Sequence, residues 1–190
     1  MSQSDRVQLV IEALQCEFPR LDTAAKAIAG RLVRLGTLFI DAIARVAATF
    51  DLSSNEYVIL CVLRASGPPY ALPPKAITPL MALSSGGMTN ILHGLAARRL
   101  IERRPDPSDR RGVLIQITPD AIKLINQAIT AHVADEHRMI ASLEPGERLA
   151  LQKLLRKLLI HIDPIPKPVR ARTEVRSIRP TPPASGRRRR

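Results

Sequence analysis

Aromatic residues are scarce in this chain of 190 residues, which has three Phe, two Tyr and no Trp. Proteins that bind RNA or single-stranded DNA commonly stack bases on aromatic side chains, so the scarcity argues against that class. Two cysteines are too few for a disulfide framework, and we therefore expect a reducing, cytoplasmic environment. No apolar run reaches the roughly 18 residues that a transmembrane helix needs. The N-terminus, with acidic Asp5 and Glu12, does not resemble a signal peptide.

Catalytic patterns are also missing from the sequence. It contains no Ser/His/Asp arrangement, no phosphate-binding glycine loop and no CxxC pair, so we expect neither an enzyme nor a cofactor. His132 and Glu136 share one helix face with His137 beside them, which could begin a metal site, but a solvated face explains them and we predict no metal. Oxidant sensing by Cys16 stays open, whereas Cys61 lies in an apolar run typical of a buried small residue.

Positive charge is plentiful, with a formal net charge of +12. The segment 163–190 carries a net charge of +7 and six prolines, which predicts a disordered basic tail; residues 1–162 carry the remaining +5. A basic balance favours nucleic acid first and an anionic membrane surface second, and we predict no membrane partner. The tail could add non-specific DNA affinity, bind a partner, or be a soluble end.

The N-terminal third of the chain predicts helices. From Thr23 to Thr49, apolar residues recur three and four positions apart, which is the period of an amphipathic helix. The segment 2–20 predicts a separate short helix that ends at Pro19. Because 27 residues exceed an ordinary globular helix, we interpret residues 1–50 as an N-terminal extension and dimerisation helix.

Three shorter helices are predicted next. Ser53 and Glu56 have the spacing of a capping box, so a helix should begin there and run to Ala65. A short helix distorted by Pro79 is expected over 74–82. A third helix, 84–98, is capped by Ser84 and turns a seam of Met88, Leu92 and Leu95 to the core.

A β-hairpin with a charged tip follows these helices. Residues 100–104 and 112–117 read as strands, and 105–111 as the turn between them, with Arg110 and Arg111 at the tip. Three short helices and a hairpin form a winged helix-turn-helix, which we assign to residues 51–118. The DNA major groove is about 12 Å wide and admits one helix, which suits the helix 84–98. The arginines near this helix and the hairpin are Arg98, Arg99, Arg103, Arg104, Arg110 and Arg111.

Two further helices are expected in residues 119–162. Thr118-Pro119 predicts a cap and a first-turn proline for a helix that ends near Ile140. The last helix, 147–162, carries a broad stripe of Leu and Ile that a monomer could not easily cover. We therefore interpret 119–162 as C-terminal dimerisation helices of a homodimer. The expected fold class is mainly α, with a winged helix-turn-helix lobe between long terminal dimerisation helices.

Residues 52–125 resemble the MarR family of bacterial transcriptional regulators. The resemblance rests on the segments 80–90, 95–103 and 104–112, where Asp109-Arg110-Arg111 forms the wing motif, and on Ile117-Thr118-Pro119. It implies a homodimer that binds double-stranded DNA. The sequence departs from the usual family pattern at Ile91 and Gly94, where many relatives carry the Arg or Lys of a phosphate contact, at His93, where they carry an acid, and at Arg99, which replaces a glycine.

The resemblance places DNA contacts on the helix 84–98 and on the wing. Asn90 can pair with adenine, Arg110 is our choice for the wing contact, and Asp109 is expected to orient an arginine. The full predicted set of DNA-binding residues is Ser84, Ser85, Thr89, Asn90, His93, Arg98, Arg103, Arg104, Arg110 and Arg111. The family also implies a small aromatic or lipophilic effector, for which Phe39, Phe50 and Tyr57 are pocket candidates, although core packing explains each of them as well.

The sequence thus predicts a cytoplasmic, nucleoid-associated, sequence-specific regulator that acts on a pseudo-palindromic site. We expect a repressor, although the sequence does not distinguish a repressor from an activator. Two alternatives stay open. One is an architectural DNA-binding protein with little sequence preference, and the other is a dimeric scaffold whose wing has lost DNA binding.

Overall fold

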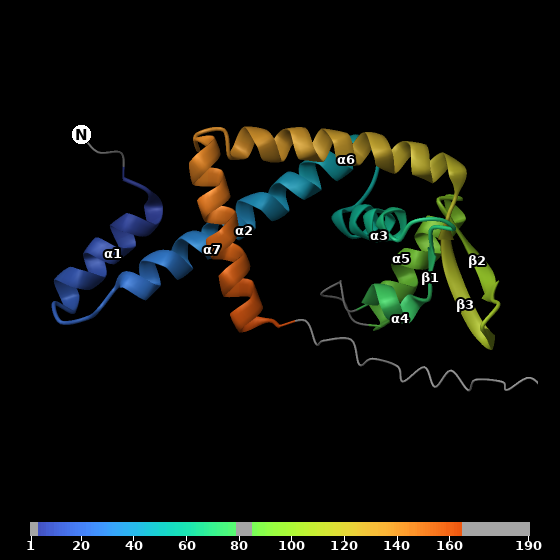
Figure 1. Ribbon diagram of the computed structural model, residues 1–190, viewed down its shortest axis with the longest axis horizontal. Helices are drawn as coiled ribbons and strands as arrows, with labels where there is room; N and C mark the ends of the chain where they lie inside the picture. Colours follow the sequence, from blue (N-terminus) through green and yellow to red (C-terminus); the bar gives the residue numbers. More distant parts are fainter. Residues whose placement is uncertain (1–3, 79–84, 165–190) are drawn as a thin grey trace, which may run out of the picture. The chain divides into compact units, whose positions relative to one another are not determined.

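The computed structural model describes residues 4–78 and 85–164, which are mainly helical (Figure 1). It forms two compact units, one up to Ser142 and one from Leu143 onward, and each is described by itself. The elements of the first unit are α1 (Arg6–Glu17), α2 (Ala24–Thr49), α3 (Ser54–Ala65), β1 (Ala71–Leu72), α4 (Pro74–Ile77), α5 (Ser85–Ala97), β2 (Ile101–Asp106), β3 (Asp109–Ile117) and α6 (Pro119–Met139). The second unit contains α7 (Pro145–Ile162).

The helix starts follow the predicted caps. The Ser53 hydroxyl accepts a hydrogen bond from the Glu56 N–H, and the Glu56 carboxylate accepts one from the Ser53 N–H, which completes the capping box of α3. The Thr118 hydroxyl accepts a hydrogen bond from the Ala121 N–H and Pro119 occupies the first turn of α6, as expected. The predicted helix 74–82 is described only as α4, because Pro79 lies outside the described residues.

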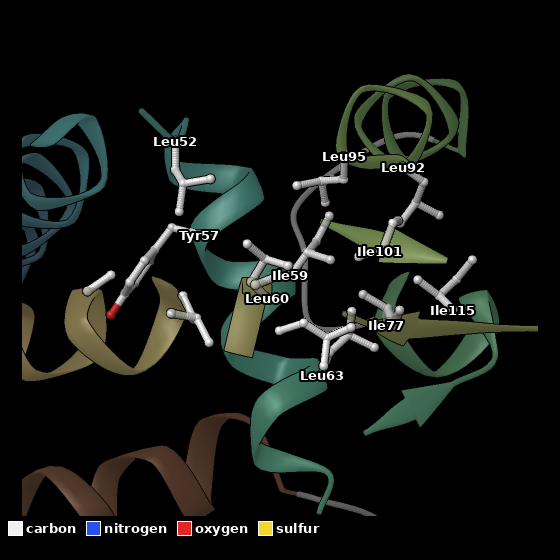
Figure 2. Packing of buried hydrophobic residues seen from close by; sticks show 14 of the residues in the cluster. Leu52, Tyr57, Ile59, Leu60, Leu63, Ile77, Leu92, Leu95, Ile101 and Ile115 are labelled. Carbon is white, nitrogen blue, oxygen red and sulfur yellow. The ribbon is translucent and has the colours of Figure 1, made fainter. Parts of the chain in front are cut away.

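The hydrophobic core lies within the described residues of the winged lobe, 51–78 and 85–118, and extends onto α6 and the end of α2. Figure 2 shows Leu60 and Leu63 of α3 facing Leu95 of α5 and Ile115 of β3, all fully buried. Burial of each such side chain stabilises the fold by about 1.5–3 kcal/mol. Because helices and strands both contribute to this core, the lobe holds α5 and the hairpin in a fixed arrangement.

The N-terminal arm consists of α1 and residues 24–40 of α2. Helix α1 lies against α2 (Figure 1), and Ile11 of α1 is buried. The Asp5 carboxylate caps α1 by accepting hydrogen bonds from the N–H groups of Val7 and Gln8, and it also pairs with Arg31 of α2 at 2.8 Å. The helix predicted over 2–20 is thus confirmed in a shorter form that ends at Glu17.

The sheet is antiparallel with the order β1–β3–β2, and it corrects the predicted hairpin. The sequence pattern predicts a turn over 105–111, but pairing continues outward until Asp106 faces Asp109, with an irregularity at Pro105/Asp106. The turn is therefore Pro107-Ser108, and Arg110 and Arg111 belong to β3. The carboxylate of Asp106 accepts hydrogen bonds from the N–H and hydroxyl of Ser108, which closes this shorter turn.

In its described residues, 143–164, the second unit has one helix, which carries an exposed apolar stripe. Helix α7 begins at Pro145, two residues earlier than predicted, because Glu144 and Glu147 form a capping box. It contains no buried residue, and the side chains of Leu154 and Leu159 are 61% and 64% exposed. None of the helices in residues 4–78 and 85–164 is both long and apolar enough to cross a membrane.

Candidate nucleic-acid interface

Helix α5 presents one apolar and one polar face. Met88, Leu92 and Leu95 are buried in the lobe, as their spacing predicts, whereas Asn90 and His93 are exposed. Thr89 is exposed beside them. A helix that packs only one side and leaves small and polar residues on the other can enter the major groove without disturbing its own core.

Helix α5 ends in a left-handed residue that is not glycine. Arg99 has a φ of 59°, and the N–H groups of Leu100 and Arg99 donate to the carbonyls of Leu95 and Ala96 at 2.9 Å each. These two hydrogen bonds together form the Schellman motif, which usually places glycine at the position of Arg99. The Thr118 hydroxyl donates to the Arg99 carbonyl at 3.0 Å, so the start of α6 helps to hold this conformation.

Arg98 is occupied within the lobe. Its guanidinium pairs with Glu56 of α3 at 3.2 Å and with the Asp51 carboxylate at 3.0 Å, and it donates to the Asp51 carbonyl as well. These bonds tie the end of α5 to the corner between α2 and α3, where Asp51 has a φ of 55°. No local sequence signal reveals this contact, because the partners lie 42 and 47 residues away from Arg98.

The wing arginines fall on different faces of the hairpin. Arg103 is paired across the sheet with Ile115, whose side chain is buried, so the two residues share the face that packs on α5. Arg104 belongs to the opposite face by alternation and pairs with Glu102 at 2.7 Å. Arg111 is exposed on β3. Of the predicted contacts, Ser84 and the side chains of Ser85 and Arg110 lie outside the described part of the chain.

The backbone near the wing tip is shaped by two acids and a glycine. The Asp109 carboxylate accepts a hydrogen bond from the main-chain N–H of Arg111 at 3.0 Å, so it orders the backbone that carries this arginine. A Cβ added at Gly112 would lie 2.8 Å from the Cβ of Asp106 and 3.1 Å from the carbonyl of Asp109. Only glycine fits that close approach, and the tight turn therefore depends on it.

A hollow of about 280 Å³ lies between α4, α5 and the sheet. Met88, Leu92 and Val113 form apolar walls, while Thr89 and Arg103 supply polar groups. Arg103 makes no ion pair among the described residues. The hollow thus combines an apolar interior with one cation directly beside the polar face of α5.

The aromatic residues predicted as pocket candidates do not line this hollow. Tyr57 is buried, and its hydroxyl lies 2.9 Å from Nδ1 of His132, with the two rings edge to face. Burial raises the pKa of Tyr57, so it stays protonated. Phe50 packs against the same core, and Phe39 is half-buried on α2. Burial also raises the pKa of the Cys61 thiol, which packs there too, whereas Cys16 is exposed on α1.

His132 and Glu136 do not belong to a metal site in the part of the chain that the structure describes. Nε2 of His132 lies 3.6 Å from the Glu136 carboxylate, but no group of three or more His, Cys, Asp or Glu side chains is placed to hold a metal there.

Known proteins match both the sequence and the fold. The model of the MarR family matches residues 52–113. The transcriptional regulator PecS of Dickeya dadantii (strain 3937) is 30% identical over 162 residues, which cover 85% of this chain and 98% of PecS. This chain belongs to the MarR family. As a MarR-family member it is a DNA-binding transcriptional regulator and not an enzyme.

Solved structures share its fold. BpsR of Bordetella bronchiseptica, whose DNA binding is regulated by 6-hydroxynicotinic acid, is 27% identical with a TM-score of 0.58, and the match covers 69% of this chain and 91% of that one. A mutant MarR from Escherichia coli in complex with operator DNA is 22% identical with a TM-score of 0.59, over 82% and 99% of the two chains. The second likeness concerns the fold alone.

Proposed function

We propose that this MarR-family chain acts in the cytoplasm as a homodimeric repressor that binds a pseudo-palindromic DNA site. The observation that carries the proposal is the division of α5 into a buried apolar seam and an exposed polar face, next to a wing that carries exposed arginines. The exposed apolar stripe of α7 supports a dimer, since a second copy would cover it.

The proposed DNA contacts are of two kinds, one to a base and the others to the phosphate backbone. Asn90 reads an adenine, while Thr89, His93 and Arg111 hold the phosphate backbone near α5 and the wing. Ser84, Ser85 and Arg110 join them on the strength of the family resemblance. We leave Arg98 out, because its guanidinium already pairs with Asp51 and Glu56. Arg104 is a weaker candidate, because it is paired with Glu102.

Selection of the full chain against random duplexes tests the function as a whole. We expect a palindromic motif whose half-site centres lie about 34–36 Å apart, one helical turn of DNA. Uniform enrichment would instead identify an architectural binder. No enrichment at all would favour the interaction scaffold.

Two variants separate base reading from phosphate contact. Asn90→Ala should relax one position in each half-site, with a loss of about 1–3 kcal/mol of discrimination. Arg111→Gln should keep the motif but reduce the slope of log K against log[salt] by about 0.9 for each phosphate that the variant no longer neutralises. Arg138→Gln is the control, since Arg138 is an exposed arginine of α6 that pairs with Asp135. If Arg138→Gln lowered DNA affinity as much as Arg111→Gln, the phosphate contact assigned to Arg111 would be wrong.

An effector site is proposed in the hollow beside Arg103. Small-molecule sites commonly measure about 300–1,000 Å³, and this hollow of about 280 Å³ lies just below that range, which limits it to a small ligand. A planar aromatic carboxylate would place its ring against Met88 and Val113 and its charge on Arg103. DNA phosphate would compete for the same guanidinium, so ligand and DNA should weaken each other's binding to the same degree.

Calorimetric titration without DNA tests this site, with 6-hydroxynicotinic acid as the probe because it regulates the similar BpsR. Arg103→Gln should weaken binding at least about tenfold, because the variant removes a charge-assisted hydrogen bond. Arg104→Gln, on the opposite face of the hairpin, should leave it unchanged. Binding that survives Arg103→Gln would place the acid elsewhere and leave the DNA-binding proposal untouched.

A further inference from the structure

A second hollow, of about 370 Å³, lies in the N-terminal arm between α1 and α2. Its walls are apolar and are formed mainly by Val7, Val10 and Ile11 of α1 and by Val33 of α2. A Cβ added at Gly30 would lie 2.7 Å from Val7, so the glycine permits α1 to approach α2 at this point. The volume falls within the range of about 300–1,000 Å³ that small-molecule sites occupy.

The rim of this hollow carries positive charge that no ion pair of the described residues neutralises. Arg6, Lys26 and Arg34 line it, and none of the three makes an ion pair or side-chain hydrogen bond among the described residues. A neighbouring hollow of about 390 Å³ shares Arg6 and Arg34 with it. The one acid among the residues lining the two hollows is Asp5, and Arg31 already pairs with it at 2.8 Å.

We propose that the hollow between α1 and α2 binds an amphipathic organic anion, a carboxylate carried on a medium-length alkyl chain. The chain would lie against Val10 and Val33, and the carboxylate would be held among Arg6, Lys26 and Arg34. Charge complementarity favours this occupant over a second copy of the same arm, because a symmetric contact would bring the three cations against their own counterparts. The site is separate from the hollow beside Arg103, and it does not depend on DNA binding.

A fluorescent reporter can test the site in the full chain, because the natural sequence has no Trp. Val33→Trp places an indole on the wall of the hollow, and Ile40→Trp places one on an exposed position of α2 that lines neither hollow. Octanoate is the probe, and octanamide is its uncharged counterpart of nearly equal shape. Octanoate should change the indole emission of the Val33→Trp variant with saturation, while the emission of the Ile40→Trp variant should stay constant.

Neutralising the rim tests the part played by charge. In the Val33→Trp background, Lys26→Gln with Arg34→Gln should weaken octanoate at least about tenfold and leave the weaker binding of octanamide unchanged. The matched control is Lys153→Gln with Arg156→Gln on α7, which removes the same net charge. Equal weakening by both pairs would mean that octanoate responds only to the overall charge of the protein, and the proposal would fall.

Two further outcomes would overturn the proposal. If octanoate and octanamide bind equally, the hollow is merely an apolar surface without anion selectivity. If octanoate has no effect while the emission of the Val33→Trp variant changes with protein concentration in step with sedimentation, a second copy of the chain covers the hollow. Neither outcome touches the DNA-binding proposal, whose readout is the selected motif.

Discussion

The winged lobe and the N-terminal arm use their apolar residues in opposite ways. In the lobe, Leu63, Leu95 and Ile115 are fully buried against one another, whereas Leu9 and Ile40 in the arm are 58% and 64% exposed. The lobe therefore completes its own core within one chain. The arm has apolar surface to spare, which is useful only if something else contacts it, such as a second copy or a ligand.

The largest expected difference comes from one leucine in each region. Leu63→Ala should lower the free energy of unfolding by about 2–5 kcal/mol, because it leaves a cavity in a close-packed core. Leu9→Ala should change it by less than about 0.5 kcal/mol, because its side chain is already largely in solvent. Denaturant unfolding at low protein concentration measures both. A loss of about 2 kcal/mol or more at Leu9 would show that the arm is buried in solution and would break the comparison.

Arginines give a smaller contrast between the two regions. Arg98→Ala should destabilise the lobe by about 1 kcal/mol, because it removes two ion pairs and a hydrogen bond to a carbonyl at a partly exposed site. Arg31→Ala in the arm should cost about 0.5 kcal/mol, because it removes one ion pair, with Asp5, whose two partners are both partly exposed. The same unfolding experiment applies, and amide exchange in α1 should quicken in Arg31→Ala alone. Exchange that quickens equally in both variants would contradict this division.

Two carboxyl groups provide the smallest effect. Hydrogen bonds hold the pKa of Asp5 and of Asp106 below the ordinary 3.8: for Asp5 chiefly from the Gln8 N–H, with Arg31 adding to it, and for Asp106 chiefly from the Ser108 hydroxyl. Both groups therefore contribute stability that is present above pH 3.8 and is lost as the pH falls through the lowered pKa. A carboxyl NMR titration should find both below 3.8. An ordinary pKa for Asp5 alone would mean that the start of α1 is not formed in solution.

Local signals in the sequence predicted most of the helices of the fold. Ser53 with Glu56, and Thr118 with Pro119, define helix starts through bonds that span only three residues, so sequence spacing alone reveals them. The buried seam of α5 was likewise predicted from its period. Strand β1 was missed because it has two residues, and only its pairing with β3 makes it a strand.

The hairpin and the arginine set show where sequence reasoning stops. Pro and Asp in 105–111 indicated a long turn, but Pro105 is tolerated on an edge strand and Gly112 makes room for Asp106, so pairing continues outward. Arg98 looked equivalent to Arg103 and Arg111 in the sequence. Its pairing with Asp51 and Glu56 depends on how α3 packs on α5, which no local pattern encodes.

The short turn at Pro107-Ser108 means that the length of the wing can be changed by inserting residues beside it. Because β3 is paired on both sides near its base while its outer half meets only β2, residues added next to the turn would extend the hairpin without entering the core. Two residues added to each strand preserve which side chains face inward and lengthen the wing by about 7 Å. With a series of such insertions, the length of DNA that the protein protects could be measured as a function of the length of the wing.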